Sequence, residues 1–133
     1  MLCIGLKKIV KLLIQCYDPL TDKWTMIEKD VIIGARKSIT TFDDKIYIHS
    51  GTKKENFYFH CFNPRDNSLK SLNKCPKSDL STQIIGYKDG ILAISHTIPG
   101  FLYNVEKDVW IEKDLRSKLE IRNRFLDRFY KNF

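Results

Sequence analysis

Short apolar runs separated by polar turns make up most of the chain. The runs ITTF at 39–42 and IIGY at 84–87 each end in turn residues, and a second apolar run, IYIHS or ILAIS, then follows. Runs of this length, rich in Ile, Tyr and Phe and bounded by Asp, Asn and Gly, are typical of β-strands joined by hairpins. The pattern predicts an all-β fold built from antiparallel sheets.

One segment of the chain occurs three times. The copies CYDPLTDKWT, CFNPRDNSLK and LYNVEKDVWI begin at residues 16, 61 and 102, and therefore lie 45 and 41 residues apart. In each copy an aromatic residue is followed by a large apolar residue at one fixed spacing, which gives the pairs Tyr17 and Trp24, Phe62 and Leu69, and Tyr103 and Trp110. A period of 41–45 residues made of short strands is typical of a propeller or a similar array.

The order of strands and turns within one period predicts a four-stranded antiparallel unit. Asp18-Pro19, Asn63-Pro64 and Asn104 follow the aromatic residues of the three copies. Such a turn joins two strands because the Asx side chain bonds the backbone ahead and, where present, proline presets φ. The Asp89-Gly90 pair predicts a tight hairpin in which Gly90 supplies a positive φ. The aromatic residue then ends the third strand and the tryptophan opens the fourth, so we expect both rings to pack between neighbouring units.

These features resemble the kelch-repeat β-propellers, and among them the BTB-kelch proteins. The resemblance is carried by the Tyr17/Trp24 and Tyr103/Trp110 pairs, by the proline turns, and by ARKSITTFDDKIYIHSG at 35–51. That last stretch is similar to the family's block of arginine, strand, turn, strand and double glycine. The double glycine is reduced here to Ser50-Gly51, and Leu69 stands where the family has tryptophan.

The resemblance implies a partial kelch β-propeller of about two and a half four-stranded antiparallel blades within residues 1–113. It places a partial blade at 9–29 and complete blades at 38–72 and 82–112. A blade needs a neighbour or a cap on each face, so the two outermost faces are expected to be open. Copies of the chain could associate to complete the blades, a partner could cover the ends, or the chain could be a poorly stable remnant of a longer gene.

Residues 114–133 lose the alternating pattern and predict a short amphipathic C-terminal helix with a basic face. Apolar residues fall on one side of this helix, at Leu115, Leu119, Phe125, Leu126, Phe129, Tyr130 and Phe133. Lys118 and Arg122 interrupt that side. Two roles are open for the helix: it covers an open blade, or it docks on a membrane surface or a partner.

The net charge of +7 belongs mainly to the two ends of the chain. Residues 1–11 carry +3, residues 112–133 carry +3, and the body between them carries only +1. This distribution disfavours specific nucleic-acid binding. The four cysteines are far apart and form no Cys-x-x-Cys pair, which favours reduced structural thiols over a zinc site. Neither a signal peptide nor an apolar stretch of membrane-spanning length is evident, so we expect a cytoplasmic protein.

The sequence predicts a protein that is not an enzyme and that needs no cofactor or metal. The three histidines, His49, His60 and His96, lie in no nucleophile motif, and the chain has no Gly-rich phosphate loop. The catalytic Tyr and His pattern of the one copper oxidase family with kelch architecture has no residue-by-residue match here.

The resemblance instead implies recognition of another protein through the loops between strands. In the BTB-kelch family an arginine just before the first strand of a blade often contacts the partner, and Arg36 has that position. Ser81 is its equivalent in the next blade, and Lys37, Lys53 and Lys54 are further candidates. Arginine suits the task because its planar fork holds a carboxylate with two hydrogen bonds.

The family's usual role is that of a substrate adaptor for a cullin-based ubiquitin ligase, and 133 residues leave no room for its BTB domain. The resemblance to truncated poxvirus kelch-like proteins therefore implies a viral competitor, which binds a host protein in the host cytoplasm without delivering it for ubiquitination. Two other interpretations are a degenerate remnant with little function and a basic protein that binds membranes or nucleic acid through its tails.

Overall fold

A computed structural model describes residues 10–52 and 56–113 of the chain. β-Strands account for 62% of the described residues, no helix occurs among them, and every sheet is antiparallel. The prediction of an all-β antiparallel fold is therefore confirmed. The predicted helix at 114–133 lies outside the described residues, as do Lys53 and Lys54.

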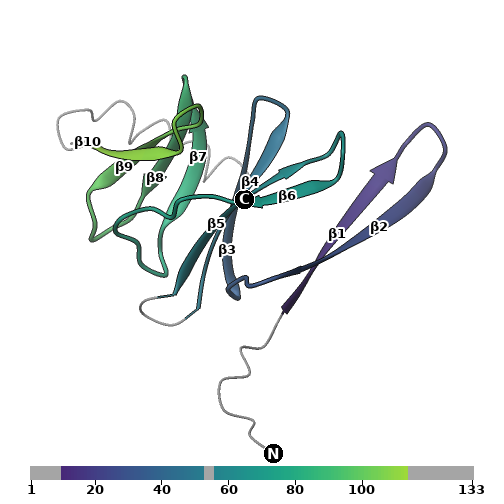
Figure 1. Ribbon diagram of the computed structural model, residues 1–133, viewed down its shortest axis with the longest axis horizontal. Helices are drawn as coiled ribbons and strands as arrows, with labels where there is room; N and C mark the ends of the chain where they lie inside the picture. The colour runs from purple at the N-terminus through teal and green to yellow at the C-terminus, as the bar shows by residue number, and fades with distance from the viewer. Residues whose placement is uncertain (1–9, 53–55, 114–133) are drawn as a thin grey trace, which may run out of the picture.

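The chain forms a two-stranded hairpin followed by two four-stranded sheets, and within each the strands pair in sequence order (Figure 1). The N-terminal hairpin consists of β1 (Val10–Asp18) and β2 (Lys23–Val31). The central sheet consists of β3 (Arg36–Phe42), β4 (Lys45–Gly51), β5 (Phe57–Asn63) and β6 (Ser68–Ser71). The C-terminal sheet consists of β7 (Gln83–Tyr87), β8 (Gly90–Ile94), β9 (Gly100–Asn104) and β10 (Val109–Lys113).

Asx residues provide most of the left-handed backbone at the hairpin turns. Positive φ angles occur at Asp22, Asp43, Asp44, Asn67, Lys88 and Asp108. Asp and Asn tolerate this region because their short side chains bond locally to the backbone. In the β7–β8 turn Lys88 has the positive φ, of 46°, so the expectation that Gly90 supplies it is wrong. Gly90 is needed for a different reason, because a Cβ there would overlap the carbonyl oxygen of Tyr103.

The central and C-terminal sheets pack face to face over one hydrophobic core. The residues that form this core come from both sheets and from the segment between them: Tyr47, Phe59, Cys61, Cys75, Ile84, Ile91, Ala93, Phe101, Tyr103 and Trp110. Strand register explains the composition, because residues directly opposite each other on paired strands share a face. Tyr47 is opposite Cys61, and Ile91 and Trp110 are both opposite Tyr103.

Side-chain hydroxyls connect the first strands of the two sheets. The backbone N–H of Ile84 in β7 donates to Ser38 Oγ of β3 at 2.9 Å, and Ser38 Oγ donates to Gln83 Oε1 at 3.2 Å. Two residues further along both strands, the backbone N–H of Gly86 donates to Thr40 Oγ1 at 3.0 Å. β3 and β7 belong to different sheets and do not pair with each other through their backbones. The side-chain hydroxyls therefore satisfy the backbone N–H groups of β7 at this junction.

The three repeat hairpins differ in how far their apolar pairs are buried. Phe62, Tyr103 and Trp110 are buried, and Leu69 is half-buried. Tyr17 and Trp24, by contrast, are 44% and 70% exposed on the N-terminal hairpin, which extends away from the two sheets (Figure 1). The expectation that Tyr17 and Trp24 pack between neighbouring units is wrong for the described part of the chain, because no sheet lies against their face there.

Candidate functional site

A pocket of about 130 Å³ opens at one end of the central sheet. It lies where β3 begins, β4 ends and β5 begins, because antiparallel pairing brings Arg36, Gly51 and Phe57 opposite one another. The segment between β6 and β7 closes its other side. The lining residues are Arg36, Lys37, His49, Gly51, Phe57, Asp79, Leu80, Thr82 and Gln83. The pocket therefore lies at the junction of the two sheets.

Phe57 and Leu80 give the largely polar lining of the pocket an apolar part. The Phe57 ring stacks on the His49 ring with centroids 5.8 Å apart. Gly51 allows this arrangement, because a Cβ at that position would lie 2.6 Å from the Phe57 ring. Leu80 adds a partly exposed apolar side chain. These apolar side chains can contact the aliphatic or aromatic part of a bound side chain.

Asp79 is the centre of a hydrogen-bond cluster beside the pocket. Its carboxylate accepts bonds from the Ser81 N–H at 2.8 Å, the Ser81 and Ser95 hydroxyls at 2.6 Å each, and the Thr97 hydroxyl at 2.7 Å. Burial opposes ionisation of Asp79, but these hydrogen bonds prevail and hold its pKa well below the usual range of a carboxyl group. The ionised Asp79 thus fastens the 79–82 turn to the loop after β8.

His49 lines the pocket, and its imidazole is uncharged at physiological pH. Its side chain is only 3% exposed, and its Nε2 lies 3.2 Å from Ser78 Oγ. Burial lowers its pKa to about 4, although the nearby negative charge of Asp79 acts in the opposite direction. The positive charge at the pocket therefore comes from Arg36 and Lys37.

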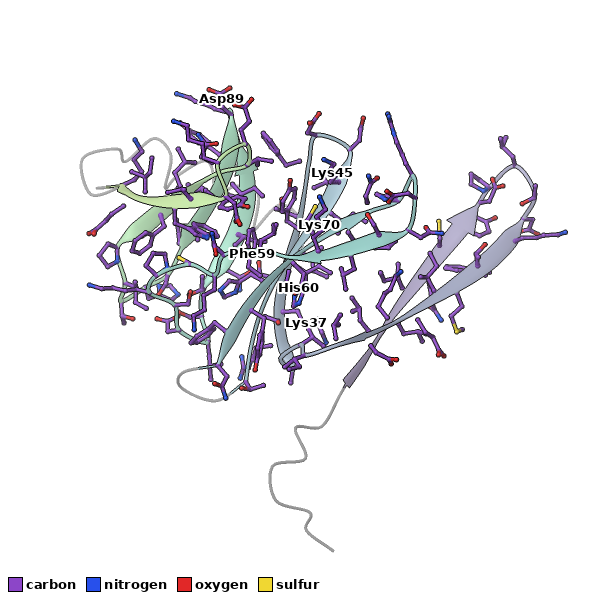
Figure 2. All side chains as sticks on the ribbon, in the orientation of Figure 1. Lys37, Lys45, Phe59, His60, Lys70 and Asp89 are labelled. Carbon is purple, nitrogen blue, oxygen red and sulfur yellow. The ribbon has the colours of Figure 1, made fainter. Side chains whose placement is uncertain are left out.

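The structure brings two of the five predicted partner-binding residues to this pocket. Arg36 and Lys37 line it and are exposed, and Figure 2 shows Lys37 at the opposite end of the central sheet from Lys45. Ser81 does not line the pocket, and its hydroxyl donates to Asp79. Lys53 and Lys54 lie outside the described residues. Gly51 was predicted as a repeat residue and proves to be part of the pocket.

Sequence reasoning missed Asp79, Phe57 and Leu80. The run SDLST at 78–82 has the composition of an Asx turn and could have indicated a bonded Asp79. No comparable signal exists for the approach of Ser95 and Thr97, whose bonds to Asp79 depend on two loops meeting.

The residues that could bind a metal ion or react as thiols were located within residues 10–52 and 56–113. No group of three or more His, Cys, Asp and Glu side chains is placed there to hold a metal ion. Cys61 and Cys75 are free and buried, and burial raises the pKa of both thiols, whereas Cys16 is free and exposed. Nowhere in this part of the chain is there a helix with the length and apolar character that crossing a bilayer requires.

No protein-family model matches the chain, and no curated protein matches it.

Proposed function

We propose that the chain is a non-enzymatic protein-interaction module of kelch type, in which the two four-stranded sheets are blades and the N-terminal hairpin is half of a third. Three features support this proposal. Each sheet is a four-stranded meander, the sheets pack face to face, and their first strands lie next to each other. The equivalent positions Ser38 and Gln83, 45 residues apart, are in direct contact, as expected for successive units of an array.

The pocket beside Arg36 is the binding site that this proposal assigns. Arg36 and Lys37 have no ion-pair partner within the described part of the chain. The neighbouring carboxylate of Asp79 is bonded to its own hydroxyl and backbone donors. A guanidinium that is free to bond, next to the apolar side chains of Phe57 and Leu80, suits an acidic side chain on a partner protein. That combination is the observation on which the proposal rests.

The consequence for the cell follows from the same proposal and from the resemblance. A chain that binds a client of a ubiquitin-ligase adaptor through this pocket occupies the surface that the adaptor needs, and therefore competes with that adaptor. We propose a host protein as the client, as for a viral competitor. The described residues carry thirteen basic and twelve acidic side chains, so they give no separate support to membrane or nucleic-acid binding. That alternative stays a prediction about the tails.

Affinity purification with matched charge variants tests the binding site. The double variant Arg36→Glu, Lys37→Glu reverses the charge at the pocket, and Arg65→Glu reverses an exposed charge in the β5–β6 turn at the opposite end of the sheet. We expect the double variant to lose a protein that both the wild type and Arg65→Glu retain. If all three retain the same set of proteins, the pocket is not the binding site.

Two further measurements test whether binding depends on charge and whether it competes with the adaptor. A purified client should bind the wild type with a dissociation constant that rises as salt is added, because the contact is between exposed charges. It should also prevent binding of the corresponding adaptor. Binding that leaves the adaptor in place would refute the competitor role while leaving the pocket assignment intact.

A further inference from the structure

The first strand of the N-terminal hairpin has one unpaired edge. β1 pairs with β2 over nine residues, and with no other strand in the described part of the chain (Figure 1). The repeat places β1 at the position of β5 and β9, because Tyr17 corresponds to Phe62 and Tyr103. β5 and β9 each have a second strand beside them, β4 and β8 respectively. The hairpin therefore lacks the two strands that complete the other sheets.

The equivalence of β1 and β9 extends to a side-chain hydrogen bond. Tyr17 in β1 donates its hydroxyl to Asp22 at 2.8 Å, and Tyr103 in β9 donates its hydroxyl to Asp108 at 2.7 Å. The two hairpins are thus built alike, and they differ in whether the inner strand has a further neighbour.

The other five edge strands of the described sheets each carry a feature that opposes further pairing. β2, β3 and β10 contain two or more charged residues each, and β6 has only four residues, one of which is Lys70. β7 is uncharged, but its N–H groups at Ile84 and Gly86 donate to the hydroxyls of Ser38 and Thr40. Charges, short length and covered donors are means by which proteins prevent the addition of a strand.

β1 has none of these protections along its centre. Its charged residues lie toward its two ends, and its five central residues are Leu12, Leu13, Ile14, Gln15 and Cys16. They include neither proline nor glycine, and the register with β2 is unbroken, so the backbone groups that point away from β2 form one continuous row. Leu13, Gln15 and Cys16 are exposed. A two-stranded hairpin is marginally stable in water, so further strands would stabilise it.

The sequence of β1 is complementary to itself in antiparallel pairing. Two copies pair over all nine residues only when the two-fold axis passes through Ile14, because Ile14 is the middle residue of the strand. Leu12 then lies opposite Cys16 of the second copy, on the face that carries Ile14. Leu13 lies opposite Gln15 of the second copy, on the other face. No like charges meet in these pairs, and such charges are what destabilises opposite positions.

We infer that β1 of one copy pairs with β1 of a second copy, so that two hairpins form one four-stranded antiparallel sheet in the order β2–β1–β1–β2. This sheet has the strand number of the central and C-terminal sheets. Ile14 lies opposite Ile27 within each hairpin, so four isoleucines cross the combined sheet in one row. The contact is isologous and closes at a dimer. It contains no residue of the pocket, so it is independent of the proposed binding function.

Light scattering on a sizing column tests this inference with the full-length chain of 15.7 kDa, and we expect the wild type to be a dimer. The double variant Leu13→Lys, Gln15→Lys places like charges opposite each other across the two-fold axis and should be monomeric. Both positions are exposed, so the hairpin should still form, and circular dichroism checks the fold. Thr25→Lys, Met26→Lys adds the same charge at exposed positions of β2, away from the axis, and should stay dimeric.

Mixing variants of opposite charge gives the decisive result. Leu13→Glu, Gln15→Glu should also be monomeric by itself. An equal mixture of the two double variants should restore the dimer, because each introduced lysine then faces an introduced glutamate. A mixture that stays monomeric overturns the inference. So does a wild type that is monomeric at every concentration, or a lysine double variant that stays dimeric.

A disulfide tests the register independently of charge. Leu12→Cys, made in a Cys3→Ser background, places a thiol opposite Cys16 of the second copy, at a Cα separation that a disulfide accepts. Oxidised glutathione should then give a covalent dimer on a non-reducing gel. Leu13→Cys in the same background puts the thiol on the other face of the sheet and should give little covalent dimer. Equal cross-linking of the two variants would contradict the pairing through Ile14.

Discussion

Ser38 and Ile84 connect the two four-stranded sheets through one buried hydrogen bond. The Ile84 N–H donates to Ser38 Oγ at 2.9 Å, while the same hydroxyl donates to Gln83 Oε1 at 3.2 Å. The hydroxyl thus acts as acceptor for a backbone group and as donor to the residue at its own repeat-equivalent position. Packing of the two sheets depends on this polar contact as well as on the apolar core.

Ser38→Ala is expected to lower the free energy of unfolding by about 1–3 kcal/mol, because it leaves the buried Ile84 N–H without its acceptor. Thr40→Val should cost less, since its partner Gly86 N–H is only partly buried. Urea denaturation followed by circular dichroism measures both effects. Thr41→Ala, at an exposed position on the same strand, is the control and should change the free energy by less than about 0.5 kcal/mol.

Trp110→Ala and Trp24→Ala should differ strongly in cost. Trp110 packs against Phe59 and Tyr103 and donates its Nε1–H to the Asn73 carbonyl at 2.7 Å. Its removal should lower the free energy of unfolding by about 3–5 kcal/mol. Trp24→Ala should cost less than about 1 kcal/mol when the protein is dilute enough to be monomeric, because Trp24 is exposed. Equal losses in denaturant titrations of the two variants would show that Trp24 is covered within the monomer.

The sequence predicted correctly which aromatic residues lie opposite each other in each hairpin, but it could not predict whether such a pair is buried. Tyr103 lies opposite Trp110, and Tyr17 opposite Trp24, because the Asx turns fix the register of each hairpin. Exposure depends instead on whether a second sheet lies against the pair. That is a property of the array and not of the hairpin, so two nearly identical segments reach opposite states.

The candidate site shows the same division between local and long-range information. The resemblance to BTB-kelch proteins indicated Arg36 as a candidate from its place near the start of a strand, and Arg36 is the first residue of β3, which is a local property. The local turn at 78–82 carried a signal for Asp79, but its bonds to the hydroxyls of Ser95 and Thr97, 16 and 18 residues further along the chain, could not be predicted. The role of Gly90 was misjudged for a related reason. The turn itself is local, but the carbonyl of Tyr103 that excludes a side chain belongs to another strand.

Gly90→Ala should lower the free energy of unfolding by about 1–3 kcal/mol, because the added methyl group forces β8 away from the Tyr103 carbonyl. Lys88→Gly separates this steric effect from the φ requirement of the turn. Lys88 has a φ of 46°, which glycine adopts without strain, so that variant should change stability by less than about 1 kcal/mol. Thermal denaturation of the two proteins compares them. A Gly90→Ala protein as stable as the wild type would contradict the close approach.

Stability should decrease as the pH falls from about 6.5 to 4, and His49 should account for much of the decrease. Burial lowers the pKa of His49 from 6.5 to about 4 in the folded protein. The unfolded chain therefore binds a proton in this range that the folded chain does not, and stability is lost as the pH falls. The difference in pKa corresponds to about 3 kcal/mol over the whole window. Burial lowers the pKa of His60 as well, so His60 acts in the same direction.

His49→Gln should flatten this pH dependence, because glutamine does not titrate. Urea midpoints measured at intervals between pH 7 and pH 4 give the slope for each protein. His96→Gln is the matched control, since His96 is exposed after β8, and it should keep the wild-type slope. Asp79 contributes to the slope mainly at the acid end of this window: its pKa lies well below the usual carboxyl range, so its stabilising contribution starts to be lost near pH 5 and is lost mostly below pH 4. The comparison of slopes is therefore made between pH 7 and about pH 5. A His49→Gln protein with the wild-type slope would show that the buried imidazole is not the group that titrates.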